Sequence, residues 1–165
     1  QTQKLQWLFE KYASKMVLDY SKKEPIIFPY RESKIFVSGK TENVLRPMAV
    51  VSLGKKNFQI NALIDTGSDR TISYLDPFGY KLGIGDDFEG EPPEELRGLF
   101  GSGKAWSTHI DIWIGNHYFN IPVFWLTKKF EITTDYPLIL GRKIIFDNFD
   151  VIFKQKEKLV YFYKH

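Results

Sequence analysis

The stretch Ala62–Ser73 reads ALIDTGSDRTIS and places an acid directly after a short apolar run. Burying a carboxylate is costly unless another group pairs with it or donates a hydrogen bond to it, so Asp65 at the end of an apolar strand needs an explanation. Gly67 allows a sharp turn and the close approach of another chain, and the Thr66 hydroxyl can tie the loop down by hydrogen bonding. Taken alone, Asp65-Thr66-Gly67 fits an ordinary Asx-type turn that closes a hairpin about as well as a catalytic loop.

Length and composition predict one mainly β domain. The 165 residues are 43% hydrophobic, which is enough for a single core. Gly (12) and Pro (8) punctuate many short apolar runs that are rich in Phe, Tyr and Trp, a pattern typical of strands. The net charge of +3 is too mild to indicate nucleic acid, although binding to polyanions stays open. The absence of cysteine excludes disulfides, thiolate zinc sites and cysteine nucleophiles, and it argues against redox chemistry.

The sequence gives only a weak indication of the compartment. No apolar run approaches the length of a membrane span, and the first residues lack the apolar core of a signal peptide. We therefore expect a soluble protein, with the cytoplasm favoured and an upstream anchor left open. Because the chain starts at Gln1 rather than Met, we also expect a processed form or an excised piece.

The first 47 residues are predicted to be an extension. Residues 4–20 carry apolar side chains at helical spacing, which predicts an amphipathic helix, and its apolar residues are Leu5, Leu8, Phe9, Tyr12 and Met16. Such a helix packs on its own domain or on a second copy, and a membrane-surface helix is the less favoured alternative. Pro25 and Pro29 predict its end, followed by a loose segment to about Pro47. We therefore divide the chain into a helix and linker extension (1–47) and a main domain (48–165).

Alternating apolar and polar residues predict two hairpins in the main domain, 48–53 with 58–64 and 106–114 with 118–126. The first hairpin delivers Asp65 at its end. A short strand over 71–75 precedes Asp76-Pro77, which has the form of a helix N-cap followed by Pro at the first helical position, so a short helix to about Leu82 is expected.

The remaining segments are also assigned from pattern. Residues 85–97 hold six acidic side chains and a Pro-Pro pair, which predicts a solvated acidic loop rather than a metal site. Residues 137–141 predict a compact buried strand, 142–149 one or two helical turns, and 151–153 and 159–163 a final pair of strands.

Two motifs, in order, resemble those of a known enzyme family. Residues 63–68 (LIDTGS) look like the active-site signature of the aspartic proteases, and 69–72 (DRTI) continue it as in the retroviral type. Residues 138–142 (LILGR) are similar to the second retropepsin motif, and 149–162 resemble the closing strands of retrotransposon and bacterial members. The resemblance covers about 48–162 and implies a retropepsin-like single lobe, a closed β-barrel, with the extra N-terminal helix outside it.

The resemblance implies that Asp65 is the catalytic acid of an aspartic endopeptidase. Pepsin-type chains carry two Asp-Thr/Ser-Gly triplets, whereas this sequence carries one, so the second acid is expected from a two-fold symmetric homodimer. Two carboxylates ~3 Å apart would repel by roughly 5 kcal/mol at an effective dielectric of ~20, so the pair would share one proton. The expected partners are a second copy and a peptide or protein substrate, and no cofactor is implied.

The same resemblance assigns supporting roles around Asp65. Thr66 would fasten the two active-site loops across the axis, Gly67 would accept a backbone hydrogen bond from the substrate, and Ser68 would add a hydrogen bond near the catalytic carboxylate. Asp69 and Arg142 would form an ion pair beside the substrate cleft, since a guanidinium fork suits a carboxylate.

Gly141 belongs to the second motif as active-site support. Lys143 departs from the family, which often has Asp or Asn after that arginine.

The resemblance also implies a glycine-rich flap that closes over the substrate, and the candidate is the run Gly98, Leu99, Phe100, Gly101, Ser102 and Gly103. Residues 98–104 also match the spacing of a phosphate-binding loop. That alternative fails because Ala105 replaces the Ser or Thr that would hold magnesium, and because an acidic loop precedes the run and a strand pattern follows it.

Other classes of function receive less support. The three histidines show no metal-ligand spacing, so no metal is predicted, and they are His109, His117 and His165. A catalytically silent retropepsin fold that dimerises or binds peptides is the main alternative, because the flap sequence around Phe100 is atypical. A β-barrel that binds nucleic acid through aromatic side chains is a weaker third hypothesis.

Overall fold

The computed structural model describes residues 20, 23–54, 58–85, 88, 92–98, 101–127 and 136–165. These residues form twelve strands, one π-helical turn and one short α-helix: β1 (Ile26–Pro29), β2 (Arg31–Val37), β3 (Lys40–Arg46), β4 (Met48–Leu53), β5 (Phe58–Ile64), β6 (Thr71–Tyr74), η1 (Leu75–Gly79), β7 (Glu94–Gly98), β8 (Gly101–Ile114), β9 (His117–Leu126), β10 (Leu138–Leu140), α2 (Ile145–Asn148), β11 (Phe149–Lys154) and β12 (Leu159–Lys164). In this described part, no helix has the length and apolar character needed to cross a membrane.

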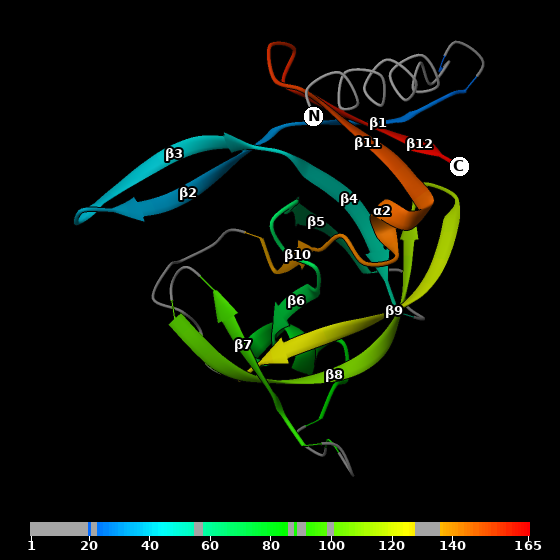
Figure 1. The fold of residues 1–165 in the computed structure, drawn as a ribbon. Coiled ribbons are helices and arrows are strands. Elements are labelled where there is room, and N and C mark those ends of the chain that lie inside the picture. The colour runs from blue at the N-terminus through cyan, green and yellow to red at the C-terminus, as the bar shows by residue number, and fades with distance from the viewer. Residues whose placement is uncertain are drawn as a thin grey trace, which may run out of the picture.

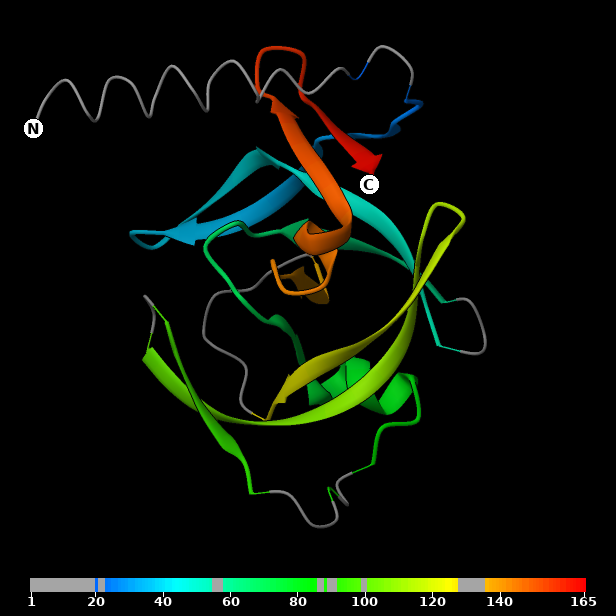
Figure 2. The same cartoon turned by 45° about the vertical axis from the view of Figure 1, so that its right-hand side comes forward.

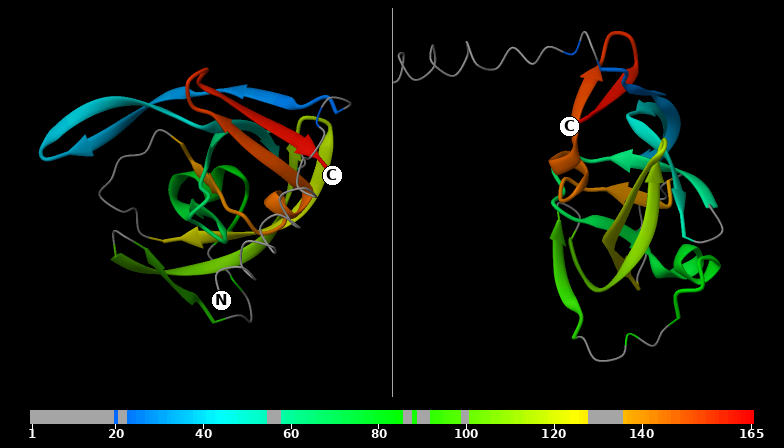
Figure 3. Two further views of the ribbon diagram at one scale, coloured as in Figure 1. Left: turned by 45° about the horizontal axis from the view of Figure 1, so that its top comes forward. Right: turned by 90° about the vertical axis from the view of Figure 1, so that its right-hand side faces the viewer.

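Three sheets make up the fold (Figure 1). The main sheet has the order β4-β5-β10-β6-β9-β8-β7, and β4 also pairs with β8, so the sheet curls back on itself. A three-stranded sheet, β1-β12-β11, lies above one end of the main sheet, as the right-hand view of Figure 3 shows. The β2–β3 hairpin forms a separate two-stranded ribbon that reaches out to one side (Figure 2).

The strand β10 lies between two strands that are close neighbours in the sequence. It pairs in parallel with β5, with Leu138 opposite Ala62 and Leu140 opposite Ile64. On its other side it pairs antiparallel with β6. The loop that joins β5 to β6 therefore spans the end of β10, and it contains Asp65.

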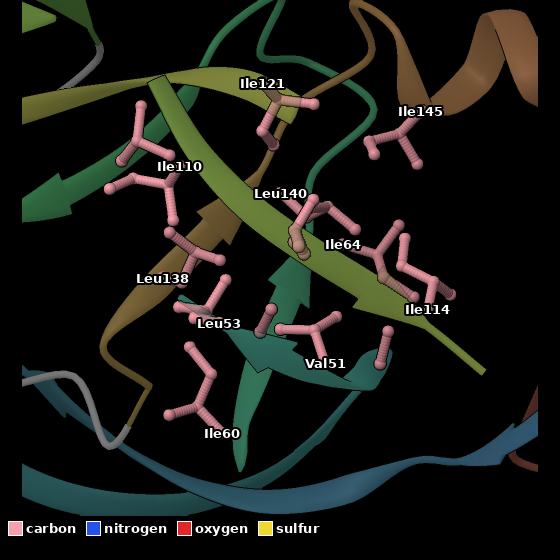
Figure 4. Packing of buried hydrophobic residues seen from close by; sticks show 14 of the residues in the cluster. Val51, Leu53, Ile60, Ile64, Ile110, Ile114, Ile121, Leu138, Leu140 and Ile145 are labelled. Carbon is pink, nitrogen blue, oxygen red and sulfur yellow. The ribbon is translucent and has the colours of Figure 1, made fainter. Parts of the chain in front are cut away.

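One apolar core joins the main sheet to the three-stranded sheet. Branched aliphatic side chains from β4, β5, β8, β9 and β10 meet there, with Ile145 from α2 (Figure 4). Phe28 of β1 and Phe162 of β12 belong to the same cluster, and their rings meet edge to face with centroids 5.4 Å apart. The first and last strands of the described chain are therefore held by the same core as the Asp65 loop.

Most of the strand pattern was predicted correctly. The mainly β expectation is confirmed, and both predicted hairpins are present as β4–β5 and β8–β9. The predicted final pair of strands is present as β11–β12. The alternation along β8 is plain in its burial, because Ile110, Ile112 and Ile114 are buried whereas the residues between them are half-buried.

Two predictions about loops were wrong. The segment predicted to be loose up to about Pro47 contains β1, β2 and β3. Pro29 does not prevent a strand because β1 is at the edge of its sheet, where a missing N–H is tolerated. The acidic loop predicted over 85–97 is a strand from Glu94 onward, since β7 pairs with β8 there. The helix predicted over 4–20 lies outside the described residues except for Tyr20, and the division of the chain at residue 47 stays a prediction.

The helical turn predicted after Pro77 is present. The Leu82 amide donates to the Phe78 carbonyl at 3.2 Å. Asp76 keeps an extended backbone (φ −101°, ψ 127°), and its peptide bond to Pro77 is cis. Gly79 packs on Leu75 and Trp125, which fixes this turn against β9.

We expect Leu138→Ala to destabilise the protein by about 2–5 kcal/mol, because the fully buried side chain fills the core beside β5 and β6. Leu45→Ala is the matched control, since Leu45 is 49% exposed on β3, and its cost should stay below about 0.5 kcal/mol. Urea unfolding of both variants measures the difference. Equal costs would show that β10 is not part of the core.

Candidate active site

Two buried strands deliver Asp65 to the surface. Ala62 and Ile64 on β5 are buried beside β10, and Asp65 is half-buried directly after them. Its amide donates to the Leu140 carbonyl at 3.1 Å, which extends the ladder by one residue. The parallel pairing therefore fixes the position of this acid in the fold.

The loop around Asp65 is held by its own backbone. The Gly67 amide donates to Asp65 Oδ1 at 2.8 Å, and the Ser68 amide donates to the Asp65 carbonyl at 3.3 Å. A Cβ at Gly67 would lie 3.2 Å from Asp65 Oδ1, so glycine lets the amide approach the carboxylate. Thr66 and Gly67 are exposed. The acid that follows the apolar strand therefore has a backbone hydrogen-bond donor, as a half-buried polar group requires.

The second predicted motif packs directly on this loop. The Arg142 amide donates to the Ser68 carbonyl at 2.8 Å, and the Lys143 amide donates to the Asp69 carbonyl at 3.0 Å. The Gly141 amide donates to Thr71 Oγ1 at 3.2 Å. The two motifs that the sequence analysis singled out are therefore in contact through main-chain hydrogen bonds.

Gly141 has no room for a side chain. A Cβ there would lie 2.2 Å from the Arg70 carbonyl oxygen and 2.8 Å from the Arg70 nitrogen. Because both are backbone atoms, the clash cannot be relieved by turning a side chain. Glycine is therefore required where the chain at residue 141 passes the Arg70 backbone.

The predicted ion pair between Asp69 and Arg142 is present. Arg142 Nε donates to Asp69 Oδ1 at 3.1 Å, and Arg142 Nη2 contacts the same oxygen. Both side chains are more than half exposed, at 52% for Arg142 and 73% for Asp69. An exposed pair of this kind contributes little to stability, so its main effect is to hold the two loops in register.

Ser68 uses its hydroxyl group locally. Ser68 Oγ donates to the Arg70 carbonyl at 2.7 Å and accepts from the Arg70 amide at 3.3 Å. The hydroxyl group therefore stiffens the loop behind the carboxylate. The backbone of Arg70 is fixed from two sides, by this hydroxyl and by Gly141.

Sequence reasoning missed the side chain of Arg70. Its guanidinium lies 4.4 Å from the centroid of the Phe124 ring and forms an ion pair with Glu94 on β7. The pair links the Asp65 loop to the base of the β7–β8 hairpin. The opposite charges at 70 and 94 were visible in the sequence, but nothing local indicated that the two residues would meet.

The predicted flap lies on the β7–β8 hairpin. Gly98 on β7 pairs with Gly101 on β8, and Arg97 pairs with Ser102. Leu99 and Phe100 lie outside the described residues. The hairpin is thus present at the expected place in the chain, and its closure over a substrate stays a prediction.

The described residues bring no second catalytic acid motif to Asp65, because the chain holds a single Asp-Thr-Gly triplet. Within the described ranges, no group of three or more His, Asp or Glu side chains could hold a metal ion. The arrangement in one chain therefore presents one anchored carboxylate beside an exposed Thr-Gly pair.

Comparison with known proteins places the fold. No protein-family model matches the chain, and no curated protein does. Among solved structures, a retropepsin-like aspartic protease from Rickettsia conorii is similar with a TM-score of 0.54 at 16% identity, over 87% of this chain and 92% of the other. At this identity the likeness shows that the two proteins share a fold.

Two further solved structures are similar over less of the chain. The EIAV protease, solved with the inhibitor HBY-793, has a TM-score of 0.45 at 20% identity and covers 62% of this chain and 86% of its own. The protein Lpg0085 from Legionella pneumophila, of unknown function, has a TM-score of 0.40 at 18% identity and covers 62% and 85%.

We expect Gly141→Ala to cost about 3 kcal/mol or more, because its methyl group would overlap the Arg70 backbone. Gly67→Ala should cost under about 1 kcal/mol, since its methyl group would meet only the end of the Asp65 side chain, which can shift. Thermal and urea unfolding of the two variants measure the contrast. A Gly141→Ala protein as stable as Gly67→Ala would contradict the close crossing.

We expect the Asp69–Arg142 pair to have a coupling energy below about 1 kcal/mol in a double-mutant cycle of Asp69→Asn and Arg142→Gln. The coupling should shrink further in about 1 M salt because exposed charges are screened. Urea unfolding of the four proteins gives the value. A coupling several times larger that persists in salt would mean that the pair is desolvated.

Proposed function

We propose that the chain is an aspartic endopeptidase in which two copies each contribute Asp65 to one catalytic pair. The observation that carries the proposal is the half-buried Asp65 carboxylate, anchored by the Gly67 amide in a loop that the second motif clamps. The fold shared with a retropepsin-like aspartic protease supports it. Because the chain has a single Asp-Thr-Gly triplet, the pair requires a second copy.

The proposed dimer brings the two loops together on a two-fold axis. Thr66 and Gly67 are exposed in the single chain, so both are accessible to a partner loop. In the dimer, Thr66 would fasten the two loops to each other. Gly141 and Arg142 would hold each loop from behind through the contacts with Ser68 and Arg70.

The proposed reaction follows from the proton that the pair shares. Two carboxylates about 3 Å apart cannot both be ionised without strong repulsion, so one is ionised and the other keeps a proton. The ionised Asp65 removes a proton from a water molecule, whose oxygen attacks the scissile carbonyl carbon. The protonated Asp65 gives its proton to the carbonyl oxygen, which forms a neutral tetrahedral diol.

The second half of the reaction reverses the direction of proton transfer. The carboxyl group that took the proton of the water gives it to the amide nitrogen as the C–N bond breaks. A diol hydroxyl returns its proton to the other carboxylate as the new carboxyl group forms. The enzyme ends with one proton on the pair, as it began, and no covalent intermediate is formed.

The β7–β8 hairpin is the proposed flap. Its base is beside the Asp65 loop through the contact of Glu94 with Arg70. The strand pairing continues to Gly98 and Gly101, so the described part of the hairpin is a paired ribbon along its length. Closure of the ribbon would exclude bulk water from the pair while the reacting water is retained.

The decisive test is hydrolysis of an unfolded protein substrate from about pH 4 to about pH 7. We expect cleavage with a bell-shaped pH dependence and inhibition by a pepstatin-like inhibitor, because activity needs one protonated and one ionised acid. Asp65→Asn should lower the rate by about 10²–10⁴-fold, whereas the exposed Asp76→Asn should leave it unchanged. Cleavage that survives in Asp65→Asn would refute the mechanism, and substrate binding without cleavage by the unsubstituted chain would identify a silent peptide-binding module.

Mixing tests the shared pair directly. Equal amounts of unsubstituted and Asp65→Asn chains, allowed to exchange, should retain about one quarter of the activity, because only dimers with two acids are active. Independent single-chain sites would retain about one half. Sedimentation at the same concentrations checks that dimers are present.

A further inference from the structure

The three-stranded sheet β1-β12-β11 has large apolar side chains on both of its faces. One face belongs to the core through residues such as Phe28, Val160 and Phe162. Side chains alternate along a strand, so the residues between them point to the opposite, outer face. The outer face carries Ile27, Ile152, Leu159, Tyr161 and Tyr163, with the charged residues Asp150 and Lys154 at the two ends of β11.

Apolar side chains form a row across the middle of the outer face. Ile27 is opposite Tyr161, which is opposite Ile152, so the three side chains form one row across the sheet. The rings of Tyr161 and Tyr163 stack with centroids 6.2 Å apart. None of the outer-face residues belongs to the core clusters of the described chain, and Ile27 is 48% exposed. An antiparallel sheet with a free second face usually carries polar residues along the whole of that face, so the apolar row across its middle favours a covering partner.

The described residue Tyr20 already lies on this outer face. Its ring centroid is 4.3 Å from that of Tyr163. Loss of solvent contact, together with the charge of Asp150 and a hydrogen bond to it, raises the pKa of the Tyr20 phenol. Asp150 is opposite Tyr163 in the sheet, and its Oδ2 atom is buried without a hydrogen-bond partner among the described residues. The side chain of Tyr20 therefore lies against the outer face shortly before β1 begins.

The spacing of the sequence before Tyr20 continues this contact. A helix turns about 100° per residue, so Met16 and Phe9 would lie within about 40° of Tyr20 around the axis, whereas Lys15 would lie about 140° away. Tyr20 is thus the last member of the apolar stripe predicted over residues 4–20. A helix of that length spans about 25 Å, which is enough to cover strands of six residues, about 20 Å long.

We propose that residues 4–19 form an amphipathic helix that docks its apolar stripe on the outer face of the β1-β12-β11 sheet of the same chain. Tyr20 is the point where the helix joins the face. The helix buries the row formed by Ile27, Tyr161 and Ile152, and its lysines face solvent. The proposal stands independently of the peptidase function.

Cysteine cross-linking tests this docking, because the chain has no cysteine of its own. The test protein carries Met16→Cys and Ile152→Cys, and the matched control carries Lys15→Cys and Ile152→Cys. A short bis-maleimide is added to each full-length protein, and the products are separated by mass. Docked cysteines meet at a high effective concentration, so we expect about tenfold more intramolecular cross-link in the test protein than in the control.

A second pair and a mixing experiment make the outcome decisive. Met16→Cys with Ile27→Cys repeats the test from β1, where the half-exposed side chain can be replaced with little effect on folding. Mixed chains that carry Met16→Cys or Ile152→Cys alone should give no cross-linked dimer. Equal yields in test and control, no cross-link from either pair, or a cross-link only between mixed chains would overturn the proposal, and the last result would assign the face to the helix of a second copy.

Discussion

The parallel pairing of β5 with β10 is the constraint on which the candidate site depends. It joins two segments that lie more than seventy positions apart and brings their ends to the same place. Every contact between the two motifs follows from it, from the Asp65 amide on the Leu140 carbonyl to the Arg142 amide on the Ser68 carbonyl. The contact between the two motifs is tightest at Gly141, because the Arg70 backbone occupies the space that a side chain at residue 141 would need.

Burial of apolar side chains, rather than charge, supplies most of the free energy that stabilises the contact between the two motifs. Leu138 and Leu140 are fully buried, and each such side chain contributes about 2–5 kcal/mol relative to alanine. The Asp69–Arg142 and Arg70–Glu94 pairs lie at the surface, where an ion pair contributes about 1 kcal/mol or less. The core therefore brings the loops together, and the ion pairs only favour one local arrangement of those loops over similar ones.

The local sequence pattern predicted the individual strands better than it predicted which strands contact one another. Alternation identified the β8–β9 hairpin because one face is buried and the other is not, and the apolar run before Asp65 identified the candidate acid. The β2–β3 ribbon was missed because its strands are mostly exposed and carry charged residues. Neither strand has a clear buried face, so its sequence shows little alternation of apolar and polar residues. The insertion of β10 between β5 and β6, and the contact of Arg70 with Glu94, depend on long-range packing that no local spacing encodes.

The contacts that fold the Asp65 loop lie within one chain, whereas the proposed chemistry requires a second carboxylate from another copy. The core and the backbone hydrogen bonds position the Asp65 carboxylate within a single chain, and the Gly67 amide donates to it. The proposed hydrolytic pair also needs one of its two members to retain a proton, and the approach of a second carboxylate would supply the repulsion that keeps that proton bound. In the proposed dimer, the same loop would supply one half of the catalytic pair. Under that proposal the activity would depend on protein concentration, because two copies must associate, whereas the contacts that hold the loop lie within one chain.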